Sequence, residues 1–395
     1  MKILLINKFL YRKGGSESYM FNLSDALTKM GHEVECWGMK GKKNIVHDKY
    51  NCFAENIDFL QLSSFNKIKS VFSTIYSFKN KKKIKVILDK FKPDIVHIHN
   101  FNYQLTPSIL PVIKSYGVKI IYTAHDSQLC CPYHRMYNYQ TQKICDKCVK
   151  DSFFNCLIQK CIDGSRLKSL VGMIESQFYY FLNYYEKYID IIISPSKFLA
   201  DRIKKKVNNK IIVIPNFVIN NFKEKSLKKE YVLYFGRLSR EKGLMKVLPC
   251  FEKMKIPLYI IGDGLEKSKI NQSEFIKYLG PKYNEELFTY IKNAKFVIQP
   301  SNGYENCPMA VLESLMCGTP VIVPFHSGFK ELIEDGKNGY YLDFNKENFE
   351  KKIKNWFNNY DENLIENCQR IYNEKYTEEI HIQKILSEYK KLINN

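Results

Sequence analysis

Two glutamates with seven residues between them stand in the segment SNGYENCPMAVLESLMCGTPVIV, residues 301–323: Glu305 precedes an apolar, helix-forming stretch and Glu313 lies within it. Pro308 stands at the expected first turn of this helix and Gly318 at its end, which are positions that proline and glycine favour. The unpaired N–H groups and positive dipole end of a helix N-terminus bind phosphate. The pattern therefore predicts a diphosphate site flanked by two carboxylates that accept hydrogen bonds from hydroxyl groups. By itself Glu313 is typical of a solvated helix surface, and only the whole string favours binding.

Two cations follow a different apolar run in YFGRLSREKG, residues 234–243, which supplies Arg237 and Lys242. Cations beside a helix N-terminus stabilise the negative charge that grows on a departing diphosphate. The sequence contains no Asp-x-Asp pair of the kind that holds a divalent ion. We therefore expect the two cations and the helix dipole to take the place of a metal. The alternative is an exposed Arg and Lys that simply follow a strand.

The N-terminal half offers two weaker signals at the ends of apolar runs. Gly14 and Gly15, with Glu17 close behind, follow the first run and open a helix-length stretch. Glycines there allow the backbone to approach a phosphate or sugar, although a simple turn explains them equally well. His125 and Asp126 end the run KIIYTAHD, and a strand end is where ligand-binding side chains gather, whereas a lone histidine is more often structural.

The apolar runs that precede these residues must position them. Continuous runs such as ILLI near residue 4 and DIIIS near residue 191 are typical of strands in a parallel sheet covered on both faces. Helix-length amphipathic stretches separate them, and the pattern restarts after residue 197. We predict an α/β protein of two Rossmann-like domains facing a cleft. The expected parts are residues 1–197, residues 198–376, and a helix over residues 377–395 that packs back on the first domain.

These motifs together resemble glycosyltransferase family 4, whose members are retaining enzymes with the two-domain GT-B fold and a Glu-x7-Glu signature. The resemblance covers nearly the whole chain and implies that residues 198–376 bind a nucleotide sugar while residues 1–197 face the acceptor. It implies that His125 lies near the anomeric carbon and that Glu305 binds the sugar without acting as a nucleophile. The site residues it implies are His125 and Glu305 for catalysis, and Gly14, Gly15, Arg237, Lys242, Asn306 and Glu313 for donor binding.

The expected function is transfer of a sugar from a nucleotide diphosphate to a lipid-linked or glycan acceptor, in the assembly of cell-surface polysaccharide. No cofactor is expected to be required for catalysis. Two alternatives share the fold: a sugar-nucleotide epimerase, which needs acid and base groups at the sugar C2, and a non-catalytic glycan-binding paralogue. The presence of all five key side chains, His125, Arg237, Lys242, Glu305 and Glu313, argues against a decayed site.

Six of the twelve cysteines lie between Cys130 and Cys161, which marks an insertion at about residues 130–165. Cys145 and Cys148 form a Cys-x2-Cys pair, and thiolates at this spacing suit a tetrahedral zinc ion. A similar Cys-rich insertion is present in some members of the family. A structural zinc site formed by Cys131, Cys145, Cys148 and Cys161 is one interpretation, and reduced, packed cysteines are the other.

The formal net charge is +20, and residues 1–197 carry the larger excess, with 29 Lys and Arg against 16 Asp and Glu. Residues 65–92 hold nine lysines and one acid, with apolar residues at helical spacing. This pattern predicts a basic amphipathic helix on an anionic membrane surface, with the aromatic segment 167–185 beside it; a core-facing stripe is the alternative. Positive charge without a recognised binding motif does not predict specific nucleic-acid binding. Without a signal peptide or an apolar run of 18 residues, we expect a cytoplasmic protein, peripheral at the inner face of the membrane.

Overall fold

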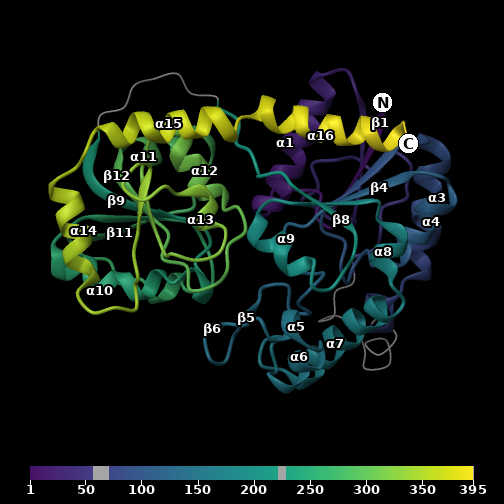
Figure 1. Ribbon diagram of the computed structural model, residues 1–395, viewed down its shortest axis with the longest axis horizontal. Coiled ribbons are helices and arrows are strands. Elements are labelled where there is room, and N and C mark those ends of the chain that lie inside the picture. The colour runs from purple at the N-terminus through teal and green to yellow at the C-terminus, as the bar shows by residue number, and fades with distance from the viewer. Residues whose placement is uncertain (57–70, 221–227, 395) are drawn as a thin grey trace. The chain divides into compact units, whose positions relative to one another are not determined.

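The computed structural model describes residues 1–56, 71–220 and 228–394 (Figure 1). The chain forms two compact units, each built on its own six-stranded parallel sheet. The α/β prediction with two Rossmann-like sheets is therefore confirmed. The first unit comprises Met1–Gln140, Cys145–Pro215 and His381–Asn395, and the second comprises Thr141–Ile144 and Asn216–Ile380.

The first sheet has the strand order β2-β1-β3-β4-β7-β8. Its central strands are the continuous apolar runs of the sequence, and they are buried because helices cover both faces of a parallel sheet. Its strands are β1 (Lys2–Ile6), β2 (Glu33–Trp37), β3 (Ile95–Ile98), β4 (Lys119–Thr123), β7 (Ile191–Ser194) and β8 (Lys210–Val213). Helices between these strands are α1 (Gly15–Lys29), α3 (Phe78–Phe91), η1 (Pro107–Ile109), α4 (Leu110–Ser115) and α9 (Lys197–Ile203).

An insertion separates β4 from β7 and contains the cysteine-rich segment. Its longest element is α7 (Arg166–Phe181). Ser165 is the N-cap of this helix, and its side chain accepts a hydrogen bond from the Lys168 N–H. The other elements are β5 (Tyr137–Asn138), β6 (Lys143–Ile144), α5 (Lys147–Lys150), α6 (Phe154–Ile158) and α8 (Tyr184–Tyr188).

The second sheet has the strand order β11-β10-β9-β12-β13-β14. Strand β12 and helix α12 (Met309–Met316) flank the segment that carries Glu305. Its strands are β9 (Lys229–Phe235), β10 (Leu258–Ile261), β11 (Ile276–Gly280), β12 (Ala294–Ile298), β13 (Val321–Val323) and β14 (Gly339–Tyr341). Its other helices are η2 (Arg240–Lys242), α10 (Leu244–Met254), η3 (Lys267–Lys269), α11 (Asn284–Asn293), α13 (Phe329–Leu332), α14 (Phe349–Asn358) and α15 (Asn363–Lys375).

The predicted boundary at residues 197 and 198 is wrong by about one helix and one strand. Strand β8 pairs in parallel with β7, so α9 and β8 complete the first sheet and the boundary falls after Pro215. The second unit correspondingly runs to Ile380 rather than to residue 376. Sequence periodicity detects strands but not which neighbour a strand pairs with, and only that pairing assigns β8.

The last helix, α16 (Glu378–Ile393), belongs to the first unit from His381 onward (Figure 1). It contributes buried side chains to that unit. The Tyr389 hydroxyl lies 2.6 Å from Nδ1 of His97 on β3, and His381 Nε2 lies 2.8 Å from the hydroxyl of Tyr19 on α1. These contacts attach the helix beneath the carboxyl ends of the strands. In the described ranges, no helix is both long enough and apolar enough to cross a membrane.

Candidate functional site

The Lys242–Glu305 ion pair is the central feature of the second unit. Lys242 Nζ lies 2.7 Å from Glu305 Oε1, and the Ser301 hydroxyl donates to the same oxygen at 2.8 Å. The two charged side chains are only 19% and 14% exposed. The pair joins the two sequence motifs across 63 residues. A shielded charge pair with an added hydrogen bond holds its geometry better than an exposed one.

Only one oxygen of the Glu305 carboxylate is engaged. Within the described part of the chain, Oε1 accepts both hydrogen bonds and Oε2 accepts none. The backbone of this residue is fixed as well, because its N–H donates to the Ser327 hydroxyl at 3.2 Å and its carbonyl accepts from the Gly328 N–H at 2.8 Å. The site thus presents a positioned carboxylate with one oxygen able to accept a hydroxyl group.

The loop that carries Glu305 depends on close backbone packing. A Cβ on Gly328 would stand 1.4 Å from the Asn306 carbonyl oxygen, so no side chain fits there. On the far side, the Asn216 side chain donates to the Cys307 carbonyl at 2.9 Å. Asn306 therefore lies between two fixed points, directly after Glu305.

Helix α12 starts next to this loop. Pro308 is its N-cap, one position before the expected first turn, and makes no side-chain hydrogen bond to the helix. No side chain caps the first turn, and the Val311 N–H donates to the Pro308 carbonyl at 3.0 Å. Within the described chain, the N–H groups of Met309 and Ala310 have no such partner and are available to an anion. The helix ends at Met316, and Gly318 follows its C-cap, Cys317. The φ of +68° at Gly318 is the left-handed conformation of a glycine that follows a helix, as predicted.

Glu313 lies on α12 and is partly buried. Burial raises the pKa of its carboxyl to about 7. No hydrogen bond or ion pair to this carboxylate occurs among residues 1–56, 71–220 and 228–394. A partly buried acid without a partner is unfavourable unless a ligand binds it, which makes Glu313 a candidate to accept ligand hydroxyls.

Arg237 is a predicted site residue that no contact in the described structure joins to the Lys242–Glu305 pair. It follows β9 with an exposed side chain, and only its carbonyl is engaged, by the Tyr234 hydroxyl at 2.9 Å. Its guanidinium makes no ion pair within the described chain. It is free to meet an anion, whereas the charge of Lys242 is already partly neutralised.

Two residues that the sequence reasoning missed complete this site, Ser327 and His326. His326 Nδ1 lies 3.0 Å from the Ser327 hydroxyl and Nε2 lies 3.2 Å from the Ser301 carbonyl, and burial lowers the pKa of the ring. Both follow the carboxyl end of β13, and this strand-end position was the available signal.

A histidine cluster occupies the carboxyl ends of β3 and β4 in the first unit. His99 Nδ1 lies 3.0 Å from His125 Nε2, and the two rings stack with centroids 5.2 Å apart. His97 bridges the Tyr389 hydroxyl at 2.6 Å and the Thr123 hydroxyl at 2.7 Å. Burial lowers the pKa of His125 and of His97 to about 3 and that of His99 well below its usual value. All three imidazoles are therefore neutral at pH 7.

The hydrogen bond between His99 and His125 favours one tautomer. His99 Nε2 is buried and has no hydrogen-bond partner in the described structure. A buried N–H without an acceptor is rarer than a buried lone pair without a donor, so the His99 proton belongs on Nδ1, where it donates to His125 Nε2. His125 then carries its own proton on Nδ1. The sequence identified His125 but not His99, which is identified by its position on the adjacent strand.

The glycine pair lies at the start of α1, where Gly14 is the N-cap and Gly15 the first helical residue. Glu17 is 5% exposed, and a Cβ on Gly14 would touch its Oε2 at 3.4 Å. Asn100, after β3, donates to the Ser16 hydroxyl at 2.9 Å. The helix start is therefore held against the same sheet edge as the histidine cluster.

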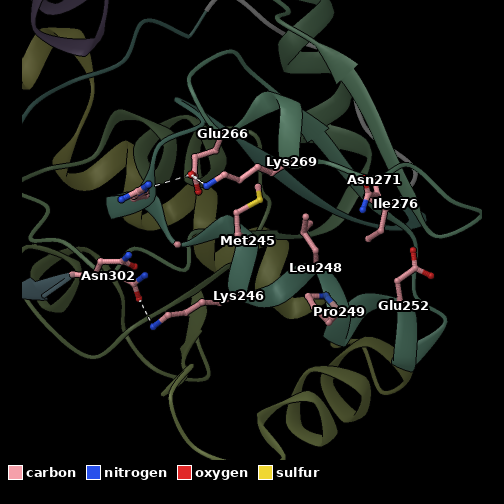
Figure 2. Close-up of a pocket in the computed structure, with 13 residues that line it drawn as sticks. Met245, Lys246, Leu248, Pro249, Glu252, Glu266, Lys269, Asn271, Ile276 and Asn302 are labelled. Carbon is pink, nitrogen blue, oxygen red and sulfur yellow. Dashed lines mark hydrogen bonds and ion pairs between the residues drawn. The ribbon is translucent and has the colours of Figure 1, made fainter. Parts of the chain in front are cut away.

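A cavity of about 570 Å³ opens beside α10 in the second unit (Figure 2). Met245 and Leu248 line its wall, and its polar rim includes Glu266 paired with Lys269 at 2.6 Å and Lys246 bonded to the Asn302 side chain at 2.9 Å. Neither Lys242 nor Glu305 nor Glu313 lines it. Because none of these three residues lines the cavity, we do not place the diphosphate there.

The cysteine cluster consists of free thiols. Cys148, Cys156 and Cys161 form a small core with Phe153, and burial raises the pKa of the nearby Cys131 to about 11. Across the residues the structure describes, no three Cys, His, Asp or Glu side chains are arranged to hold a metal ion. Zinc binding by Cys131, Cys145, Cys148 and Cys161 stays a prediction. Metal analysis of the purified protein tests it, and less than about one-tenth of an equivalent of zinc per chain would contradict it.

Two models of known families match this chain. A model described as Glycosyltransferase Family 4 matches residues 13–220, which is more than half of the chain. The chain belongs to glycosyltransferase family 4. A second model, Glycosyl transferases group 1, matches residues 217–377 and so includes the second unit of this glycosyltransferase with its Lys242–Glu305 pair.

Curated relatives of this glycosyltransferase share moderate identity. An uncharacterised glycosyltransferase of Methanocaldococcus jannaschii is 28% identical over 187 residues, which cover 46% of this chain and 53% of the relative. The alpha-monoglucosyldiacylglycerol synthase of Acholeplasma laidlawii is 24% identical over 288 residues, which cover 65% of each chain. The match thus spans less than two thirds of the length of both relatives.

Solved structures share the fold over the whole chain. Sucrose-phosphate synthase from Thermosynechococcus elongatus superposes with a TM-score of 0.69 at 16% identity, covering 100% of this chain and 99% of that one. Anabaena HepE, solved with UDP and glucose, superposes with a TM-score of 0.65 at 15% identity, covering 99% and 100%. The predicted GT-B fold of this glycosyltransferase is confirmed.

Proposed function

We propose that this glycosyltransferase transfers a hexosyl group from a nucleotide diphosphate sugar to a lipid-linked or glycan acceptor, with retention of anomeric configuration and without a catalytic metal. The observation that carries this proposal is the Lys242–Glu305 pair beside the uncapped start of α12. A cation paired with a half-engaged carboxylate, and backbone N–H groups that follow shortly after this carboxylate in the chain, support the proposal. Those groups suit a sugar diphosphate better than any neutral ligand.

Each donor-site residue has a distinct role in this proposal. The N–H groups of α12 and the exposed Arg237 bind the diphosphate, while Lys242 holds Glu305 and adds positive charge. Glu305 Oε2 accepts a sugar hydroxyl, and Glu313 accepts ribose hydroxyls. The bond from the anomeric carbon to the phosphate oxygen breaks with its electron pair on that oxygen. The acceptor oxygen bonds to the same face of the sugar, and its proton passes to the departing phosphate.

His125 acts on the acceptor side in this proposal. Its ring is neutral and oriented by His99, so it serves as a hydrogen-bond donor or acceptor near the anomeric carbon and not as a cation. The relatives support the substrate class, since HepE was solved with UDP and glucose and the Acholeplasma relative is named for a glucolipid product.

A panel of nucleotide sugars tests the function. We expect one donor to bind to the full chain by calorimetry and to undergo slow hydrolysis, with the anomeric configuration of the product retained by NMR. Replacing Glu305 or Arg237 with Ala lowers turnover by about 10²-fold, as loss of transition-state stabilisation does. Inversion of configuration, or turnover unchanged in both variants, would overturn the mechanism. Interconversion of nucleotide sugars without an acceptor would instead identify an epimerase.

A further inference from the structure

Helix α7 packs with its large apolar residues outward. Its buried face consists of small or polar residues and one tyrosine: Ser169, Gly172, Glu175, Ser176 and Tyr179. Leu167 is 71% exposed, Ile174 42%, Phe178 37% and Phe181 79%. These four recur at helical spacing, so they form a continuous apolar stripe. A helix of a water-soluble domain normally buries this stripe, which means the exposed one is available to a partner.

Packing on the buried face fixes this orientation. A Cβ on Gly172 would stand 2.6 Å from Ile162 and 3.3 Å from the Tyr103 hydroxyl, so the helix approaches its neighbours as closely as glycine allows. Tyr179 is fully buried, and its hydroxyl donates to the Ile75 carbonyl. Rotation of α7 to hide the stripe would break these contacts and expose Glu175. The apolar face is therefore a stable surface of the folded unit.

Neighbouring elements expose further large apolar side chains. Phe154 and Ile158 on α6 are 52% and 59% exposed, and Phe78 at the start of α3 is 71% exposed. Tyr76 connects the segments, because its ring lies 6.4 Å from that of Phe178 and 5.0 Å from that of Phe78. We call this set the α7 surface: Phe78, Phe154, Ile158, Leu167, Ile174, Phe178, Phe181 and Leu182.

Cations lie at several points along the margin of the α7 surface. Lys81 Nζ lies 5.2 Å from the Tyr76 ring centroid and 5.8 Å from that of Phe78, and Lys206 Nζ lies 5.7 Å from that of Tyr180. Arg166 and Lys168 stand at the start of α7 itself. Two acids lie nearby, Asp163 paired with Lys168 at 2.8 Å and Asp151, whose carbonyl accepts from Lys206. An apolar, aromatic face with a basic margin matches the interface of an anionic bilayer.

We propose that the α7 surface inserts into the interfacial region of an anionic phospholipid bilayer. Its aromatic and aliphatic side chains enter the acyl boundary, and Lys81, Arg166, Lys168 and Lys206 contact lipid phosphates. The predicted basic helix of residues 65–92 lies partly outside the described residues, and its described part supplies α3 at the margin of this surface. The inference deepens the proposed function, because a lipid-linked acceptor would be reached from this membrane.

Vesicle sedimentation of the full chain tests the docking. We expect binding to vesicles that contain phosphatidylglycerol and at least about tenfold weaker binding to pure phosphatidylcholine. The double variant Leu167→Ser, Phe181→Ser should weaken binding by at least about tenfold, since it removes two large side chains from the bilayer. Ile45→Ser removes an equally apolar side chain that is 59% exposed outside this surface, and it should bind like the wild type.

A depth measurement separates insertion from charge attraction. In an F181W variant, brominated lipids should quench the new indole fluorescence. Equal binding to neutral and anionic vesicles, or no quenching of F181W, would overturn the proposal. So would a dimer, seen by analytical ultracentrifugation, that the L167S/F181S variant abolishes.

Donor binding distinguishes failure of this inference from failure of the proposed function. We expect the L167S/F181S variant to bind the donor as the wild type does, because the substitutions lie in the other unit. Intact donor binding without vesicle binding overturns only the docking. Vesicle binding without any bound donor overturns the proposed function and leaves the docking in place.

Discussion

The Lys242–Glu305 cluster of the second unit, the proposed donor site, and the histidine cluster of the first unit have opposite electrostatics. In the second unit, the charged Lys242–Glu305 pair is shielded and braced by Ser301. In the first, His97, His99 and His125 are kept neutral by burial and linked to one another or to hydroxyl groups.

This difference follows from what each region is proposed to handle. A diphosphate that gains charge as it departs needs fixed positive groups, and a buried ion pair keeps them oriented. The anomeric carbon needs precisely placed but uncharged hydrogen-bonding groups, which a desolvated histidine supplies. The comparison predicts that activity falls when a charged side chain of the second-unit cluster is removed. In the first unit, activity should fall when a histidine ring loses its orientation.

Replacing Lys242 with Ala has the largest expected effect. The substitution removes the charge beside the diphosphate and leaves Glu305 shielded without its cation, so kcat/KM should fall by about 10²- to 10³-fold. Steady-state kinetics measure the loss. Lys246→Ala is the matched control, because Lys246 binds Asn302 and not Glu305, and its effect should stay within a few-fold. Equal losses in both variants would contradict the special role of Lys242.

Replacing His99 with Ala should act through orientation. Without the 3.0 Å hydrogen bond, His125 loses its fixed tautomer, so kcat falls by about tenfold while donor KM changes little. Nitrogen-15 NMR of the wild type should show His125 protonated on Nδ1, and the variant should show a mixture of tautomers. A wild-type spectrum with the proton on Nε2 would reverse the assigned direction of the hydrogen bond.

Glu313 should make donor affinity depend on pH. Its pKa of about 7 means that the carboxyl is neutral below pH 7 and ionised above it. Because an ionised carboxylate accepts hydroxyl hydrogen bonds more strongly, donor KM should fall a few-fold from pH 6 to pH 8. The Glu313→Gln variant should show a flat profile over that range. A donor KM of the wild type that rises from pH 6 to pH 8 would contradict this role of Glu313.

Replacing Tyr389 with Phe should have the smallest effect on catalysis. It removes the hydroxyl beside His97 and leaves a buried ring nitrogen without a partner, which costs about 1 to 3 kcal/mol of unfolding free energy. Because the two ring nitrogens of His97 bond the Tyr389 and Thr123 hydroxyl groups, the substitution should leave the His99–His125 hydrogen bond in place, and kcat/KM should stay within about twofold. Urea denaturation and kinetics measure the two effects. A large catalytic loss at unchanged stability would place His97 in the reacting site.

Local sequence signals account for more of the second-unit cluster than of the first-unit cluster. Glu305, Glu313 and Lys242 lie in strings whose strand, loop and helix signals are local, and the structure places Lys242 against Glu305 and Glu313 on the adjoining helix. His99 and Ser327 have no such local signal. They join the sites because neighbouring parallel strands bring their carboxyl ends to one edge.

Continuous apolar runs by themselves determined where the strands lie in the chain, because a strand buried on both faces requires apolar residues throughout. Pro308 and Gly318 marked the two limits of α12. Periodicity could not determine which face of α7 points inward, since a helix with apolar residues on one side satisfies the pattern in either orientation. Close packing at Gly172 decided that, just as pairing with β7 assigned β8 to the first unit. Local sequence encodes what a segment becomes, whereas steric fit between segments distant in the chain decides what each one faces.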